Sequence, residues 1–126
     1  MKIPLPKSKW IYRHEACWVF SLFKFGRIHI ELVYAPKGYS IKEHSHPSQR
    51  IELMFLWGKA SFYRREKNGM VVSANVQSPW NSFRVFTIQP WHSHWFSVSN
   101  RPLIFINLER WKNGVHITSA AEDLTY

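Results

Sequence analysis

Hydrophobic and polar residues alternate along much of this chain with the two-residue period of β-strands. The segment RIHIEL (27–32) shows the pattern most clearly, because its three apolar residues fall on one face and its Arg, His and Glu on the other. The preceding run WVFSLFKF (18–25) is separated from it by Gly26. We therefore expect these two segments to form an antiparallel pair of strands.

Further runs rich in aromatic and β-branched residues follow at short intervals, separated by Gly, Pro, Asn and Ser. The pair Asn68-Gly69 predicts a type I′ hairpin turn, in which both central residues have positive φ. Apart from a terminal turn near 119–124, we find no convincing amphipathic helix. The pattern predicts an all-β sandwich or barrel with about nine strands, at 18–25, 27–32, 51–57, 59–65, 70–76, 84–88, 94–98, 103–108 and 114–118.

The length and the cysteine content narrow the classes of protein that fit. A chain of 126 residues is the size of one domain and can bury most of its surface without disulfides or a metal. We expect a single domain over 1–126, with residues 1–15 as an N-terminal extension. Cys17 is the only cysteine, which excludes an intramolecular disulfide and a CxxC zinc site. The sequence shows neither a signal peptide nor an apolar membrane span, so we expect a soluble cytoplasmic protein.

The chain is strongly basic, with 17 Lys and Arg against 8 Asp and Glu and a net charge of +9. This charge favours anionic partners such as nucleotides, sugar phosphates or nucleic acid, although solubility alone would explain it equally well. The chain has no RNA-recognition signature, helix-turn-helix or zinc finger, so only its charge supports nucleic-acid binding. The single aspartate, Asp123, lies at the end of the chain, and site chemistry must therefore come from His, Glu or Gln.

Four of the seven histidines form two His-x-His pairs, His44/His46 and His92/His94. Side chains two residues apart on a strand point to the same side, so each pair can direct two rings at one point. An isolated pair of this kind is more often a surface or hydrogen-bonded feature. Two pairs, each beside a proline in an all-β chain, favour a shared metal site, because imidazole binds zinc, iron, copper and nickel.

The segments that carry these pairs resemble the two sequence motifs of the cupin superfamily. Gly38, five further residues, HSH (44–46) and Gly58 stand at the intervals of the first motif. The segment QPWHSHWF (89–96) resembles the second motif, with His94 in the place of its metal ligand.

The resemblance extends over residues 28–107. It implies a double-stranded β-helix, a jelly-roll barrel in which both motifs bring their ligands to one end of the lumen. It also implies that His44, His46 and His94 are the metal ligands.

The sequence does not decide which residue would be a fourth ligand. The position of the family's glutamate falls at Ile51, and Glu52 stands one residue later. Strand parity turns Ile51 inward and Glu52 outward, whereas a bulge after Pro47 would reverse the two faces. Gln49 and His92 are the other candidates.

Four further residues are candidates for a pocket at the barrel mouth. Trp91 and Trp95 flank the second histidine pair and could stack on a planar ligand, although filling the lumen would explain them equally well. Tyr39 follows the motif glycine and is expected near the mouth. Arg84 is a candidate contact for an anion, with a solvated strand edge as the alternative.

The resemblance implies a metal-binding protein that acts on a small, anionic molecule. Fe²⁺ is the ion expected first, with Zn²⁺, Mn²⁺ and Ni²⁺ as alternatives, and a dioxygenase-type reaction is expected ahead of metal-assisted isomerisation. The competing hypothesis is a non-catalytic cupin that binds or senses a sugar, a nucleotide or nucleic acid. The family also suggests a homodimer that forms through a sheet edge.

Overall fold

The computed structural model describes residues 2–3, 11–78 and 84–112. Within these ranges the chain forms β-strands and no helix, so they contain no helix with the length and apolarity needed to cross a membrane. The strands are β1 (Lys2–Ile3), β2 (Ile11–His14), β3 (Cys17–Phe25), β4 (Ile28–Ala35), β5 (Ser40–His44), β6 (Gln49–Trp57), β7 (Lys59–Arg65), β8 (Val71–Gln77), β9 (Val85–Ile88), β10 (Ser93–Val98) and β11 (Leu103–Trp111).

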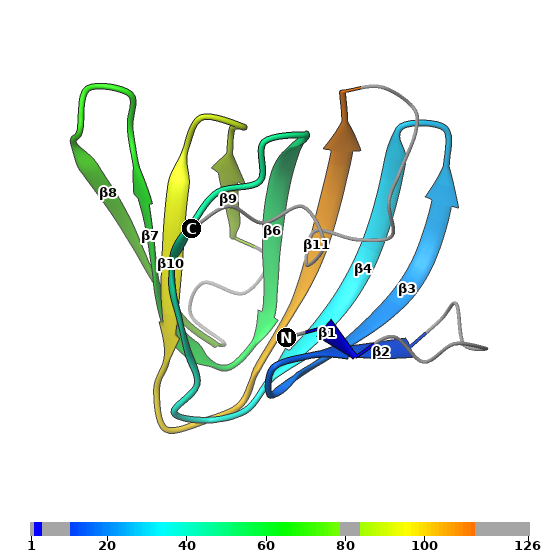
Figure 1. Cartoon of the computed structure of the whole chain (residues 1–126). Helices are drawn as coiled ribbons and strands as arrows, with labels where there is room; N and C mark the ends of the chain where they lie inside the picture. The colour runs from blue at the N-terminus through cyan, green and yellow to red at the C-terminus, as the bar shows by residue number, and fades with distance from the viewer. Residues whose placement is uncertain (1, 4–10, 79–83, 113–126) are drawn as a thin grey trace.

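These strands form two antiparallel sheets that face each other (Figure 1). One sheet has seven strands in the order β1-β2-β3-β4-β11-β6-β9, and the other has four in the order β5-β10-β7-β8. The late strands β10 and β11 each lie between two strands from earlier in the sequence. This interleaving is the arrangement of a double-stranded β-helix, and it confirms the predicted fold class.

Gly58 carries the chain from one sheet to the other, between β6 and β7. Its φ of +117° lies in a region that other residues rarely adopt, and a Cβ atom there would overlap the carbonyl oxygen of Pro102. The Gly58 N–H donates a hydrogen bond of 3.1 Å to Ser78 Oγ. Only glycine fits this crossing, which explains the glycine at this position in the first motif.

The apolar core joins the two sheets at one end of the barrel. Phe62 of β7 lies 4.4 Å from Phe55, 4.8 Å from Phe96 and 6.0 Å from Phe105, measured between ring centroids. Burial of each such side chain stabilises the fold by about 1.5–3 kcal/mol. This end is packed with aromatic rings, so the polar chemistry described below lies at the other end.

The hairpin between β7 and β8 forms where the sequence predicts it, but with a different turn. Gly69 has a φ of +88°, whereas Glu15 is the only non-glycine residue of the described ranges with a positive φ. Asn68 therefore lacks the positive φ that a type I′ turn requires. The Gly69 N–H donates to Glu66 O at 2.9 Å and the Glu66 N–H to Met70 O at 2.7 Å. These bonds form a three-residue loop that ends in a left-handed glycine.

The face of β4 that carries His29 and Glu31 is buried, whereas a strand with alternating residues usually buries its apolar face. His29, Glu31, Val33 and Ala35 are buried, whereas the isoleucines and the leucine of β4 are only half-buried on the outer face. The reason lies in the neighbouring strand, because the β11 residues opposite His29 and Glu31 are also polar and also point inward. The alternation identified the strand correctly but did not show which face is buried.

Most predicted strands are confirmed with small shifts of their ends, and three strands were missed. The missed strands are β1, β2 and β5. β5 has the sequence SIKEH, whose single apolar residue, Ile41, gives almost no periodic signal. The strand predicted at 114–118 and the turn near 119–124 lie outside the described residues.

Candidate metal centre

Three histidine rings meet inside the barrel, as the two sequence motifs predict. His44 ends β5, His46 follows in the next turn, and His94 lies on β10 directly opposite His44 in the strand ladder. The ring centroids are 4.2 Å apart for His44 and His94, and 4.9 Å apart for each pair that includes His46. One nitrogen from each ring lies within 4.8 Å of the other two, and all three side chains are buried. We call these residues the histidine cluster.

Backbone carbonyls fix the orientation of two of the rings. His44 Nδ1 lies 2.8 Å from Lys42 O, and His94 Nδ1 lies 3.4 Å from His92 O. A carbonyl oxygen can only accept, so Nδ1 must carry the proton and the lone pair is on Nε2. This is the tautomer that a metal-binding histidine adopts when a neighbouring group orients it.

Burial also favours the uncharged form of His94, which is the form of a histidine that binds a metal. The pKa of His94 is held well below the ordinary histidine value, first by desolvation and then by the neighbouring rings of His46 and His44. A neutral imidazole has the lone pair that a metal requires, whereas an imidazolium has none. At neutral pH the His94 ring is therefore available to bind a cation.

A surface brace holds the strands that carry the cluster. Arg65 of β7 donates to Glu43 of β5 through Nε at 2.8 Å, and Ser93 Oγ of β10 donates to the same carboxylate. These bonds lower the pKa of Glu43, with Arg65 as the larger cause. The brace joins three adjacent strands next to His44 and His94, and so fixes the separation of their rings.

Glu52 does not join the histidine cluster, and the expectation that it might do so is corrected. β6 turns Gln49, Ile51, Leu53 and Phe55 inward, which leaves Glu52 half-buried on the outer face. There its carboxylate lies 3.3 Å from Arg110 Nε and 4.0 Å from Arg50. No register shift interrupts the pairing of β6 with β11 at this position, so strand parity decides its direction.

Gln49 points inward and is fully buried at the start of β6, where its N–H lies 3.5 Å from His46 O. It stays a candidate for the fourth ligand. His92 is buried but turned to other partners, because its Nδ1 accepts the Gln89 N–H at 2.8 Å and its Nε2 lies 3.3 Å from Glu66. The two histidines of the second pair therefore have different roles.

The aromatic pocket residues predicted from the sequence are not gathered around the cluster. Trp95 points to the outer face of β10, where it stacks on Tyr63 at 5.3 Å with an interplanar angle of 14°. Trp91 is 55% exposed, and Lys67 lies over its ring at 5.5 Å. Trp95 therefore does not line the lumen, because strand alternation turns it away from His94.

Tyr39 and Arg84 lie away from the histidines. Tyr39 stands at the opposite end of β5 from His44, packs on Phe96 at 5.8 Å and donates to Glu15 at 2.6 Å. Burial and this hydrogen bond raise its pKa above the ordinary tyrosine value. Arg84 is exposed just before β9. The structure favours the alternative of a solvated strand edge for this arginine.

A second buried polar group was missed from the sequence. His29 and Glu31 of β4 lie beside Glu109 of β11, and one ligand atom from each falls within 4.8 Å of the others. Asn107 of β11 donates through Nδ2 to both carboxylates. The sequence signal that could have revealed it is the alternation of polar and apolar residues in IHIEL and INLER. The polar residues of both segments would have had to be assigned to the buried face. We call these four residues the carboxylate cluster.

Strand register places both clusters at the same end of the barrel interior. On β11 the inward residues run from Phe105, in the apolar core, to Glu109 in the carboxylate cluster. On β10 they run from Phe96, which packs against Phe105 at 6.0 Å, to His94 in the histidine cluster. The two sheets therefore meet through aromatic rings at one end and present polar groups at the other.

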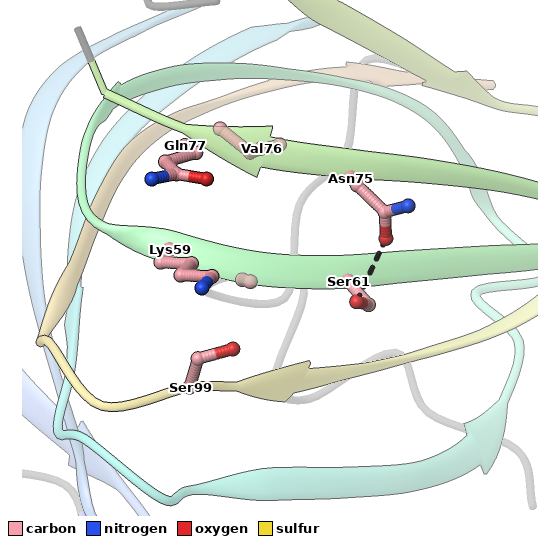
Figure 2. A pocket seen from close by; sticks show the side chains of 7 residues that line it. Lys59, Ser61, Asn75, Val76, Gln77 and Ser99 are labelled. Atoms are coloured by element: carbon pink, nitrogen blue, oxygen red, sulfur yellow. Dashed lines mark hydrogen bonds between the residues drawn. The ribbon is translucent and has the colours of Figure 1, made fainter. Parts of the chain in front are cut away.

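A hollow of about 290 Å³, with both polar and apolar lining residues, lies on the four-stranded sheet (Figure 2), and it shares no residue with either cluster. Strand β7 contributes Lys59 and Ser61, and Ser61 donates a 2.8 Å hydrogen bond to Asn75 of β8. Gln77 and Ser99 complete the polar lining. This hollow belongs to a different surface from the candidate metal centre.

Comparison with known proteins supports the fold. No protein-family model and no curated protein matches the sequence. Among solved structures, the capsular polysaccharide assembling protein CapF from Staphylococcus aureus is 13% identical with a TM-score of 0.74, and the match covers 92% of this chain and 33% of CapF. The chain thus spans about a third of the length of CapF.

Two further matches have the same architecture. A protein with a double-stranded β-helix domain from Klebsiella pneumoniae is 18% identical with a TM-score of 0.58, and the match covers 76% of this chain and 77% of that one. An oxalate oxidase in complex with glycolate is 13% identical with a TM-score of 0.64, over 79% of this chain and 53% of the enzyme. At these identities the comparisons establish the fold alone, the double-stranded β-helix that the sequence resemblance implied.

Proposed function

We propose that this chain is a metal-binding cupin whose histidine cluster holds one divalent transition metal and acts on a small molecule. The observation that carries the proposal is the meeting of three buried imidazoles from β5, the following turn and β10. Imidazole is a good ligand for Fe²⁺, Zn²⁺, Mn²⁺ and Ni²⁺, and we name Fe²⁺ first. The oxalate oxidase among the structural neighbours supports an oxidative role only as an analogy.

The charge of the site supports an anionic substrate group. Imidazole ligands bind a metal in their uncharged form, so a divalent ion held by three of them would keep its full charge for an anionic group. A bound divalent ion supplies a Lewis-acid centre with open positions, on which dioxygenase-type or isomerase chemistry depends. The protein's own part is to hold the three rings together, with the Nε2 lone pairs of His44 and His94 available, and to keep bulk water from a buried site.

Metal analysis tests this proposal directly. Protein purified without a histidine tag is expected to contain close to one transition-metal ion per chain, and the His44→Ala/His46→Ala variant is expected to lose it. His92→Ala is the matched control, because it removes a buried histidine from the same motif that faces Glu66 instead of the cluster. Equal metal content in the parent protein and the double variant would refute the proposal.

The second candidate function is non-catalytic binding of a sugar, and the outer hollow is the observation that favours it. Hydroxyl and amide groups such as those of Ser61, Asn75 and Gln77 suit hydroxylated ligands. Sugar binding that is lost in Asn75→Ala, and retained in the His44→Ala/His46→Ala variant, would favour this role. Sugar binding that is retained in Asn75→Ala and lost in the His44→Ala/His46→Ala variant would favour the metal centre as the binding site.

A further inference from the structure

The outer face of the seven-stranded sheet is apolar across four adjacent strands, β3, β4, β11 and β6 (Figure 1). Residues that pair across two strands point to the same side of a sheet, so the register defines this face. Its outward residues form four rows, which are Trp18/Tyr34/Ile104/Trp57, Phe20/Leu32/Ile106/Met54, Phe23/Ile30/Leu108/Glu52 and Phe25/Ile28/Arg110/Arg50. We call these residues the outer apolar face.

Much of this face is accessible on a single chain. Phe25 is 76% exposed, Phe23 is 50% exposed, Trp57 is 48% exposed and Tyr34 is 37% exposed. An aromatic side chain offers about 150–250 Å² for burial, so these four together expose about 300–500 Å². The aliphatic residues of β4 and β11 on this face are half-buried and add to that area. The largest apolar patch of a monomeric protein is typically about 300–600 Å², so a face of this extent indicates a contact surface.

The charged residues of the face gather at one corner, where they pair with one another. Glu52 Oε1 lies 3.3 Å from Arg110 Nε, and Glu52 Oε2 lies 4.0 Å from Arg50 Nη2. Contact surfaces commonly have such a polar rim around an apolar centre. A partner that covers the apolar rows would therefore bury no unpaired charge of this face.

We propose that the outer apolar face is the contact surface of a homodimer, in which a second copy of the chain covers it face to face. Two twisted sheets pack well on each other when their apolar faces meet, about 10 Å apart. A two-fold axis brings the same face of both copies together, so each copy covers the exposed apolar area of the other. A stable interface buries about 800 Å² on each partner, and the four aromatic side chains alone provide about half of this area.

This proposal places the contact on a sheet face, whereas the family resemblance suggests a sheet edge. The edge strands of this sheet are β1, with two residues, and β9, with four. Such short edge strands offer few backbone groups for pairing with another chain. The four strands of the outer apolar face have eight or nine residues each, so the face offers a much larger surface than the edges.

Sedimentation equilibrium of the full chain tests the proposal. The parent protein is expected to be a dimer at about 10 μM, and salt is expected to strengthen the association because it screens the repulsion between two copies that each carry a net charge of +9. Phe23→Glu places a charge in the third row and is expected to weaken the association by at least about 30-fold, as substitution of a central interface residue does. Met70→Glu is the matched control, because Met70 is 63% exposed on the hairpin between β7 and β8, and it is expected to leave the association unchanged.

Phe25→Glu is a second variant that separates association from folding, because Phe25 is the most exposed aromatic residue of the face and packs least within one chain. It is also expected to weaken the dimer. A parent protein that sediments as a monomer at about 100 μM would overturn the proposal, and so would dimers of parental strength in both glutamate variants. A monomeric parent protein that binds phosphatidylserine vesicles, and loses them as salt rises, would instead assign the face to a lipid surface. The His44→Ala/His46→Ala variant is expected to dimerise as the parent does, so failure of this proposal would leave the proposed function of the histidine cluster untouched.

Discussion

The histidine cluster and the carboxylate cluster are buried at the same end of one barrel, yet they differ in charge. The histidine cluster consists of imidazoles, which can be buried in an uncharged form, and burial lowers the pKa of His94. Two carboxylates on the seven-stranded sheet are acidic groups at most 1% exposed. The same fold therefore buries a set of imidazole rings beside one sheet and a hydrogen-bonded group of acidic side chains on the other.

From this comparison we predict that, in chelator-treated protein, the carboxylate cluster contributes more to the free energy of unfolding than the histidine cluster does. Glu109 accepts hydrogen bonds from Asn107 Nδ2 at 2.9 Å and Trp111 Nε1 at 3.2 Å, and it lies beside His29. Glu109→Ala is expected to lower the free energy of unfolding by about 3–5 kcal/mol, because it leaves buried partners unsatisfied. Glu109→Gln is the control and is expected to lose less. Urea unfolding measures both, and a loss below about 1 kcal/mol for the alanine variant would contradict the prediction.

The second prediction concerns metal affinity at the histidine cluster. His94→Ala is expected to weaken Zn²⁺ binding there by at least about 100-fold, since the loss of an outer-shell partner alone commonly costs 10–100-fold. His92→Ala is expected to leave the affinity nearly unchanged, because that ring faces Glu66. Competition with a chromophoric chelator measures both affinities. Equal losses in the two variants would show that the second His-x-His pair acts as one unit.

The sequence predicted the histidine cluster because its signal is local. Two His-x-His pairs with fixed intervals to Gly38 and Gly58 give the ligands and the fold together. The carboxylate cluster is formed by β4 and β11, whose paired residues are about 80 positions apart in the chain, as the separation of 80 between His29 and Glu109 shows. No periodicity within one strand shows that its polar face will meet another polar face.

Strand parity predicted the direction of individual side chains. It predicted that Ile51 points inward and Glu52 outward, which the structure confirms. It would also have excluded Trp95 from the lumen, since Trp95 is adjacent to His94 on the same strand. The turn at Asn68-Gly69 and the polar strand β5 were beyond such reasoning, because turn type and strand pairing depend on neighbours that the local sequence does not specify.

A third prediction tests whether the outer brace preserves the geometry of the histidine cluster. Glu43→Gln removes the charge that Arg65 holds at 2.8 Å and weakens the link between β5 and β7. Because the brace acts through the strands and does not touch the metal ligands, Zn²⁺ affinity is expected to fall by about 10-fold, the low end of outer-shell effects. The carboxylate cluster lies on the other sheet and does not touch the brace, so the melting temperature is expected to stay close to that of the parent protein. A large fall in the melting temperature together with the fall in Zn²⁺ affinity would indicate a general loss of structure.

The smallest expected effect belongs to Glu52, the carboxylate one residue beyond the position that motif spacing gives to the family's glutamate. Its side chain is 25% exposed and pairs with Arg110, whose side chain is 50% exposed, so Glu52→Gln is expected to change the free energy of unfolding by less than about 1 kcal/mol. Its metal content is expected to match that of the parent protein. Substituting Gln49→Leu in parallel tests the inward-facing position of the same strand, and a lower Zn²⁺ affinity there would identify Gln49 as the fourth donor. A loss of metal in Glu52→Gln would instead require β6 to turn its other face inward, which would also expose Ile51 and destabilise the core that this residue helps to fill.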